Sequence, residues 1–126
     1  MEPLFLFNLA SRHVGWASVR QAAIAGNIAN AHTPGYKAVD AEPFTAVLDK
    51  THLTLARTAQ SHMDVAASGV HTQKVAAADS WGVSPSGNSV SLEQEMLKAD
   101  EVNRAYSLNT SIVRAFHRMI LASVKT

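Results

Sequence analysis

The side chains in this 126-residue sequence that could carry chemistry are mainly histidines and the carboxylates of one charged segment. The histidines are scattered at His13, His32, His52, His62, His71 and His117. No two of them are four residues apart, and none belongs to a HExxH segment, the spacings that place two metal ligands on one helix face. The sequence therefore predicts no metal site.

The charged segment spans residues 93–104. Its members are Glu93, Glu95, Lys98, Asp100, Glu101 and Arg104. Acids and bases alternate over several faces of one expected helix, which is typical of a solvated helix surface rather than of a catalytic acid and base. Gly82 and Gly87 are not followed by the Lys-Ser/Thr of a phosphate-binding loop. We therefore expect no catalytic residue, no cofactor and no enzyme.

The composition favours long helices in one domain. Apolar residues make up 47% of the chain but aromatic residues only 6%, so the apolar content is mostly small and aliphatic. Such a mixture suits helices that pack side by side. The net charge of +1 provides no basic surface for nucleic acid, and the absence of cysteine excludes disulfides.

The N-terminal residues 4–7 form the longest strongly apolar run. It is far shorter than the roughly 20 residues that cross a bilayer. No basic residue precedes it and no small-residue cleavage site follows it, so we expect neither a membrane span nor a secretory signal peptide.

Residues 3–31 predict a helix of about 26 residues, roughly 40 Å long. Its apolar positions alternate three and four apart, in a heptad-like pattern. They are Phe7, Ala10, Val14, Ala17, Ile24 and Ile28, with Gln21 as the one polar occupant of the series. Further apolar residues lie on an adjoining face, which is typical of a helix shared with neighbouring chains or central in its domain.

A corner follows this helix. Thr33 precedes a proline and is therefore driven toward an extended backbone. Pro34 presets φ for the first central position of a turn, and Gly35 supplies the positive φ that a type II turn needs next. Tyr36 is then the first large side chain after the turn.

Two asparagines, Asn27 and Asn30, share one face of the helix just before the corner. One reading is a local cap, because asparagine bonds readily to nearby backbone groups. The other is an interchain or interhelix hydrogen bond from at least one amide. Both readings stay open.

Residues 37–89 lack sustained periodicity. Residues 42–48 predict a short helical turn, with Pro43 near its first position. Residues 52–55 alternate as a short strand would, and residues 62–69 and 84–89 are typical of loops. A segment of this length suggests a mobile insert, or a region that only partners order.

The second long helix starts at Ser91, with Gln94 as its capping-box partner, and runs for about 33 residues or 50 Å. Apolar residues form a broad stripe along it, with Asn109 inside. The stripe is Leu92, Met96, Ala99, Val102, Ala105, Tyr106, Ile112, Val113, Phe116, Met119 and Ile120. Two helices cannot bury stripes this broad against each other alone, so we expect further helices from other chains.

The fold class expected is mainly α. Two long N- and C-terminal helices pack as a coiled-coil-like pair, and an irregular middle segment contains short β and turn elements. We expect residues 1–37 and 86–126 to form a discontinuous assembly domain, and residues 38–85 an insert that contacts neighbouring subunits. The expected helix-packing or subunit interface is Phe7, Ala10, Val14, Ala17, Ile24, Ile28, Leu92, Met96, Ala99, Val102, Tyr106, Asn109, Val113, Phe116 and Ile120.

Two motifs are specific enough to indicate a family. One is Asn-Ile-Ala-Asn followed by Thr-Pro-Gly-Tyr at residues 27–36; the other is Gly-Asn-Ser-Val with Glu-Met at residues 87–96. Together they closely resemble bacterial flagellar basal-body rod proteins over residues 7–37 and 86–124. Residues 53–63 are similar to the B-type proximal rod proteins, with the C type as the alternative. Ser86 and Ser91 stand where this subgroup often has Asp.

The resemblance implies a structural subunit of the proximal rod, in the periplasm, that assembles helically around the export channel. The partners implied are other proximal rod proteins, the ring-to-rod adaptor protein, the membrane ring protein and further copies of itself. It also implies delivery by the flagellar type III export apparatus without a cleaved signal peptide, no nucleic acid and no direct membrane spanning.

Two other classes of protein remain as alternatives to the rod subunit. One is a soluble helical-bundle adaptor or chaperone, which would close a discrete bundle by itself. The other is an amphipathic surface-bound protein, against which the scarcity of Lys and Arg in the first helix argues.

Overall fold

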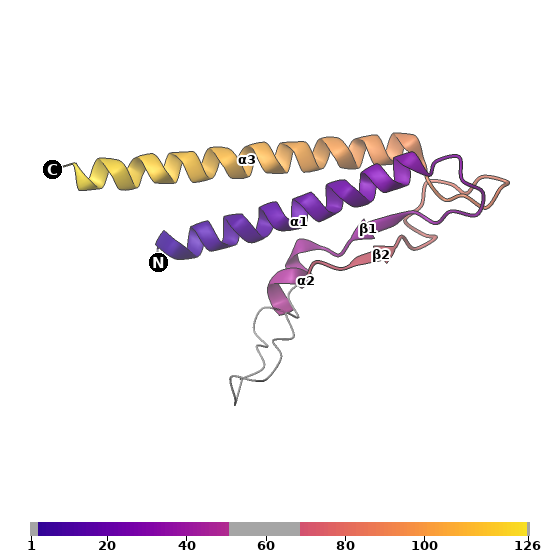
Figure 1. Ribbon diagram of the computed structural model, residues 1–126, viewed down its shortest axis with the longest axis horizontal. Coiled ribbons are helices and arrows are strands. Elements are labelled where there is room, and N and C mark those ends of the chain that lie inside the picture. The colour runs from indigo at the N-terminus through magenta and orange to yellow at the C-terminus, as the bar shows by residue number, and fades with distance from the viewer. Residues whose placement is uncertain (1–2, 51–68, 126) are drawn as a thin grey trace, which may run out of the picture.

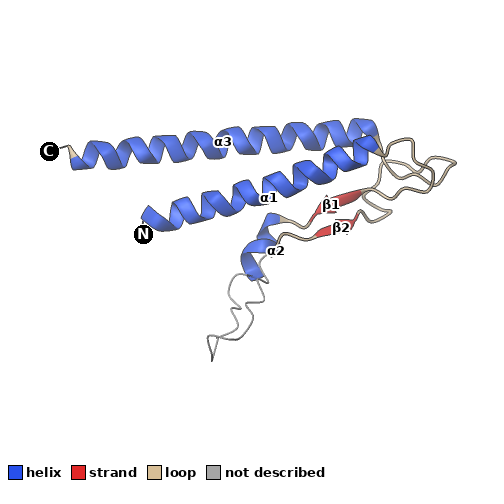
Figure 2. Ribbon diagram, in the orientation of Figure 1, coloured by secondary structure: helices blue, strands red, loops and turns tan. Residues whose placement is uncertain are grey.

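The computed structural model describes residues 3–50 and 69–125. Its elements are α1 (Pro3–Ala29), β1 (Val39–Ala41), α2 (Phe44–Asp49), β2 (Thr72–Lys74) and α3 (Leu92–Val124). The two long helices lie side by side and run in opposite directions, so that both chain ends lie at the same end of the pair (Figure 1). The loops gather at the opposite end (Figure 2). The expected fold class is confirmed.

The core between α1 and α3 is thin. Its centre consists of Ala17, Ile24 and Val102, each no more than 3% exposed, with Trp16 and Ala99 packed against it. The small alanines let the two backbones approach closely, but they bury little apolar area. Helix α3 therefore has one buried stripe and leaves its remaining faces open, whereas α1 also contacts the middle segment.

Two contacts hold the helices together nearer the chain ends. The rings of Phe7 and Phe116 meet edge to face, with centroids 5.8 Å apart. Such a pair adds about 0.5–1.5 kcal/mol beyond its buried area. The Asn109 amide donates to the Ala10 carbonyl at 3.0 Å, which gives one side chain of the α3 stripe a fixed partner on α1.

The middle segment contributes a two-stranded antiparallel ribbon along α1. Val39 pairs with Lys74, and Ala41 with Thr72. Neither strand was predicted, because three residues are too few to show alternation and all three residues of β2 are exposed. The predicted short helical turn is confirmed as α2, with Pro43 at its N-cap, one position before its first helical residue.

The other expectations for the middle segment have mixed outcomes. The loop at residues 84–89 is confirmed, whereas residues 52–55 and 62–68 lie outside the described residues. The Trp16 indole on α1 donates to the Glu42 carbonyl at 2.7 Å. The described parts of the segment are thus ordered by α1 itself, so the expectation that only partners would order them is wrong there.

Helix α3 begins as predicted, with Ser91 as N-cap accepting from the Gln94 backbone N–H. The second half of the expected capping box is wrong. The Gln94 side chain turns outward instead, donating to the Asp79 carbonyl at 2.8 Å and accepting from the Trp81 N–H at 3.4 Å. Gln94 therefore ties the loop before α3 to its first turn.

Candidate functional site

The candidate site is the corner where α1 ends and α3 begins. Gly35 has a φ of +73°, and the Tyr36 N–H donates to the Thr33 carbonyl at 3.2 Å. The predicted type II turn is confirmed. A Cβ on Gly35 would meet no atom within 4 Å, so the backbone conformation rather than space calls for glycine here.

The corner is bonded to the loop that precedes α3. The Gly35 N–H donates to the Ser86 carbonyl at 2.9 Å, and the Ser89 N–H donates to the Tyr36 carbonyl at 3.0 Å. The Ser89 hydroxyl also accepts from the Ala38 N–H at 2.9 Å. The two sequence motifs therefore form one structural unit, although about 50 residues separate them along the chain.

Asn88 completes the end of α1 from this loop. Its side chain is nearly buried, and its amide nitrogen lies 2.9 Å from the Asn30 carbonyl, 3.0 Å from that of Ala31 and 2.8 Å from that of Thr33. The two amide hydrogens thus serve three carbonyls of the turn that follows α1, so at least one of these hydrogens is shared between two acceptors. The sequence analysis gave Asn88 no role, although its place in the second motif was a signal.

Asn27 on α1 bonds to both β1 and α3, and its side chain is fully buried. Its amide nitrogen donates to the Val39 carbonyl at 2.7 Å and to Glu95 Oε2 at 2.9 Å. Its carbonyl oxygen accepts from the Val39 N–H at 3.0 Å and from the Tyr36 hydroxyl at 3.4 Å. The amide thus pairs with β1 as a neighbouring strand would, while it also bonds α1 to α3.

Asn30 has a different role from Asn27. Its amide donates to the Gly26 carbonyl at 2.9 Å, one turn back in α1, and its oxygen accepts from the Thr33 hydroxyl at 3.1 Å. Each of the two readings left open for this pair therefore holds for one residue. Asn27 makes the interhelix bond, and Asn30 makes the local cap.

A charged network continues from Asn27 across the helix pair. Lys98 lies 3.1 Å from Glu95 Oε1 and 3.3 Å from Asp40, while Arg20 lies 3.2 Å from both Asp40 and Glu101. Glu95 is only 1% exposed, so its carboxylate depends on these partners for compensation. The prediction of a solvated surface is wrong for Glu95.

A signal for the burial of Glu95 was present in the sequence. Glu95, Val102, Asn109 and Phe116 repeat every seven residues, so Glu95 lies on the inner stripe. Its two oxygens are occupied by Asn27 and Lys98, which leaves no free acid or base. A buried polar contact of this kind fixes the register of two helices. The site is therefore structural in character.

A second polar centre is Glu42, at the start of α2. Its carboxylate accepts from the Lys50 ammonium and, at 3.2 Å, from the His71 N–H. These two interactions, with Lys50 the stronger, hold the pKa of Glu42 below its ordinary value. The Glu42 N–H also donates to the His71 carbonyl at 2.9 Å, which extends the pairing of the β ribbon by one hydrogen bond beyond Ala41 and Thr72.

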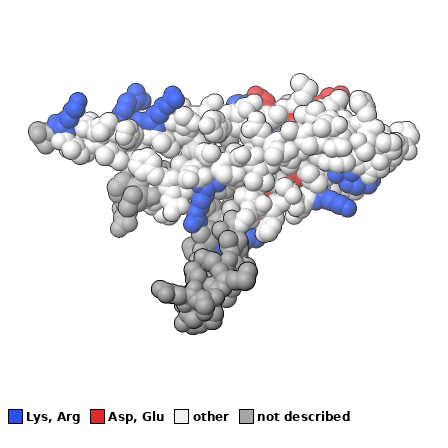
Figure 3. Space-filling model, in the orientation of Figure 1, with Lys and Arg blue, Asp and Glu red and all other residues white. Residues whose placement is uncertain are grey.

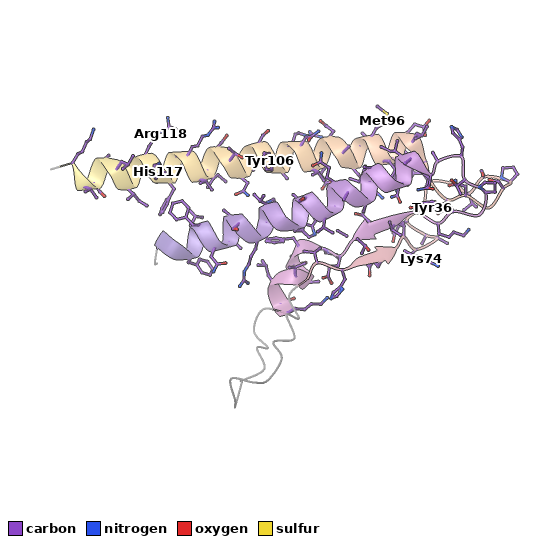
Figure 4. All side chains as sticks on the ribbon, in the orientation of Figure 1. Tyr36, Lys74, Met96, Tyr106, His117 and Arg118 are labelled. Carbon is purple, nitrogen blue, oxygen red and sulfur yellow. The ribbon has the colours of Figure 1, made fainter. Side chains whose placement is uncertain are left out.

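The predicted interface residues divide between two environments. Ala10, Ala17, Ile24 and Val102 are buried between the helices; Phe7, Ala99, Asn109, Val113, Phe116 and Ile120 are half-buried along the same seam. Val14, Ile28, Leu92, Met96 and Tyr106 are exposed. Met96 extends from α3 on the side away from α1 (Figure 4). The structure thus brings only part of the set together within one chain.

These features define a class of protein: a helical-hairpin structural subunit, with its register fixed at one end and apolar faces left open. A family model described as "Flagella basal body rod protein" matches residues 17–37, the second half of α1 and the corner. The chain is also 44% identical to "Flagellar basal body rod protein FlgB" of Agrobacterium fabrum over 132 aligned residues, covering 99% of this chain and 96% of that protein.

The chain therefore belongs to the flagellar basal body rod protein family, as a structural subunit of the proximal rod. The expected resemblance to the B type rather than the C type is confirmed by the near-complete match to the relative.

Proposed function

We propose that this subunit enters the rod by packing the exposed apolar faces of α1 and α3 against helices of neighbouring subunits in a helical assembly. The observation that carries the proposal is the amount of large apolar surface on α3. Met96 is 67% exposed, Leu108 63% and Met119 60%. Leu108, Ile112 and Met119 follow helical spacing and form one exposed apolar strip, and such a strip marks an interface rather than a free face.

An apolar groove supports this proposal. It has a volume of about 300 Å³ and lies where α1, α2 and α3 come together. Its wall includes Leu6 and Leu9 from α1, Phe44 from α2, and Leu108 and Ile112 from α3. The side chains of a further helix would complete this half-formed core, as ridges fill grooves between packed helices.

Family membership supports the remaining parts of the proposal. We expect residues 1–37 and 86–126 to stack with neighbours, and residues 38–85 to reach toward other subunits. The neighbours would be other proximal rod proteins, the ring-to-rod adaptor protein and the membrane ring protein. The chain would reach the periplasm through the type III export apparatus without a cleaved signal, and it would have no enzymatic role.

The structure bears on membrane spanning in one respect. None of the three helices that it describes combines the length and the apolar character of a membrane span.

The proposal is tested by Ile112→Glu, which places a charge in the groove. Ile112 is 45% exposed, so the isolated subunit should keep its helical content while rods fail to form. Asn103→Glu is the matched control, because Asn103 is exposed on the opposite edge of α3. Basal bodies would be isolated from strains that carry each variant as the sole copy. Normal rods with Ile112→Glu would contradict the proposed packing.

A further inference from the structure

The charges on α3 are separated by sign along its length. Residues 92–103 carry four acids and one base, whereas residues 104–125 carry four bases and no acid. Basic side chains project from the C-terminal half of α3 away from α1, and acidic ones lie over its N-terminal half (Figure 3). The exposed charges on this outer face are Glu93, Asp100, Arg104, Arg114, Arg118 and Lys125.

These charges lie on one face because they follow helical spacing, with steps of three, four and seven residues. Ser107 and Ser111 occupy the same face between Arg104 and Arg114. The face is thus continuous, with an acidic section, an uncharged section and a basic section. We call it the outer face of α3.

The helix dipole explains only part of this order. Glu93 lies in the first turn, where its own backbone N–H and the Ser91 hydroxyl lower the pKa of the carboxylate. Dipole effects fade within the first and last turns. Asp100 lies eight residues after Leu92, and Arg114 lies ten residues before Val124, so both are beyond its reach.

Contacts within the chain do not account for the basic section either. Asp100 pairs with Arg104 at 2.7 Å, one turn apart on the same helix. In the part of the chain that the structure describes, Arg114, Arg118 and Lys125 have no ion-pair partner. Among the residues that the structure describes, three cations therefore lie along an exposed helix face without an ion-pair partner.

We propose that the outer face of α3 is a contact between two copies of this chain, in which the basic section of one copy lies beside the acidic section of the next. The complementary pattern belongs to the same chain, which identifies the partner as a second copy. The contact rests on the proposed function, because it is one of the interfaces of the rod assembly.

The two α3 helices run parallel in this contact, displaced along their axes. A displacement of 18 residues, about 27 Å at the usual rise, brings Asp100 of one copy level with Arg118 of the next, and Glu93 level with Ser111, three residues from Arg114. A parallel, displaced contact is heterologous and repeats into an open array, whereas an antiparallel one closes into a dimer. A rod subunit requires the open array.

Charge reversal in cells tests the contact. One variant carries Arg114→Glu with Arg118→Glu, and a second carries Glu93→Lys with Asp100→Lys; all four residues are exposed. Each double variant should reduce the number of rods per cell about tenfold, as the loss of two exposed ion pairs implies. The variant with all four changes should recover to within about twofold of the native chain, because complementarity is restored with inverted sign.

The fourfold variant separates the possible partners. An acidic surface on a different protein, or an anionic membrane, would meet only the basic section, so the fourfold variant would stay as defective as the first double variant. That result would overturn the proposal. Normal rods with both double variants would overturn it too, while failure of Ile112→Glu to disturb rods would count against the proposed function instead.

Disulfide cross-linking tests whether the two α3 helices run parallel, and it can be used because the chain has no native cysteine. Glu93→Cys and Ser111→Cys, co-expressed as separate chains, should cross-link in assembled rods, because both lie on the outer face and the displacement of 18 residues brings them level. Ser107→Cys alone should not. A Ser107 homodimer would instead show the antiparallel pair, in which Ser107 lies close to the two-fold axis, and would overturn the parallel arrangement. An absent 93–111 cross-link would do the same.

Discussion

Replacing Asn27 by Asp changes one amide nitrogen into an oxygen and keeps the shape of the side chain. The two bonds that Asn27 donates, to the Val39 carbonyl and to Glu95 Oε2, are lost. The bond accepted from the Val39 N–H can remain. The change therefore removes two donors from a site that is fully buried and places a second carboxylate beside that of Glu95.

The expected loss in the free energy of unfolding is large for so small a change. The bond to the Val39 carbonyl accounts for about 1 kcal/mol. The two carboxylates cannot both stay ionised at this separation, so one must hold a proton. At pH 7 that costs about 1.36 kcal/mol for each unit between the pH and the ordinary carboxyl pKa, or roughly 4 kcal/mol. The sum, about 4–5 kcal/mol, approaches the whole stability of a small domain.

The measurement is urea unfolding of the purified chain, followed by far-UV circular dichroism. Asn30→Asp is the matched control, because the amide nitrogen of Asn30 donates to the Gly26 carbonyl one turn back in α1 and not to another element. It should cost no more than about 1 kcal/mol. The deficit of Asn27→Asp should shrink as the pH falls from about 7 to 5, since the folded variant binds a proton that the unfolded chain releases.

Glu95→Gln in the Asn27→Asp background should recover about half of the loss, because a glutamine amide can donate to the new carboxylate. Equal costs for Asn27→Asp and Asn30→Asp would refute the reasoning. So would the absence of any coupling between positions 27 and 95.

Three other substitutions examine separate parts of the fold. Gly35→Val should abolish rods while the subunit is still synthesised, because a β-branched residue at φ +73° costs about 2 kcal/mol or more. Gly35→Asn should keep the rods, because asparagine tolerates this φ. Normal rods with the valine variant would show that the turn is dispensable. The pKa of Glu42 is lowered in the fold, so its stabilising contribution is present above the unfolded pKa and is lost as the pH falls. The protection factor of the His71 amide, its intrinsic exchange rate divided by the observed rate, should therefore fall on acidification in the native chain but much less in Glu42→Gln. Equal pH profiles of the protection factor would contradict this. Phe116→Asp places a charge against Phe7 and should prevent rod assembly. Phe116→Leu should lower the free energy of unfolding, measured in urea, by only about 1–2 kcal/mol. Normal rods with the aspartate variant would mean that the contact with Phe7 is not needed.

The long-range architecture could be predicted from local patterns. Apolar residues at helical spacing, the cap at Ser91 and the Pro34-Gly35 pair define both long helices and the corner, because each depends on nearby residues only. The short strand β2 could not be predicted this way. Its three residues are all exposed and too few to show alternation, and they form a strand by pairing with β1.

Only part of the candidate site could be predicted from the sequence. The turn and the two asparagines were identified, but Glu95 was assigned to the surface from the charges around it. Local charge alternation and the seven-residue relation to Val102 give opposite answers at this position, and the seven-residue relation prevails because Asn27 and Lys98 compensate the buried carboxylate. The role of Asn88 depends on a loop geometry that no local pattern encodes.

The bond from Asn88 to the end of α1 also has a consequence for the order of folding. It joins residues 58 positions apart, and the other bonds of the corner close loops of similar length. Such contacts form late, because the entropy of closing a long loop is lost before any of them can form. Helix α1 can start to coil as soon as it is made, but the corner that follows it stays without these bonds until the loop before α3 is present. The corner therefore acts as a completeness check: a subunit truncated before residue 88 has a first helix and no means of fixing where the chain goes next.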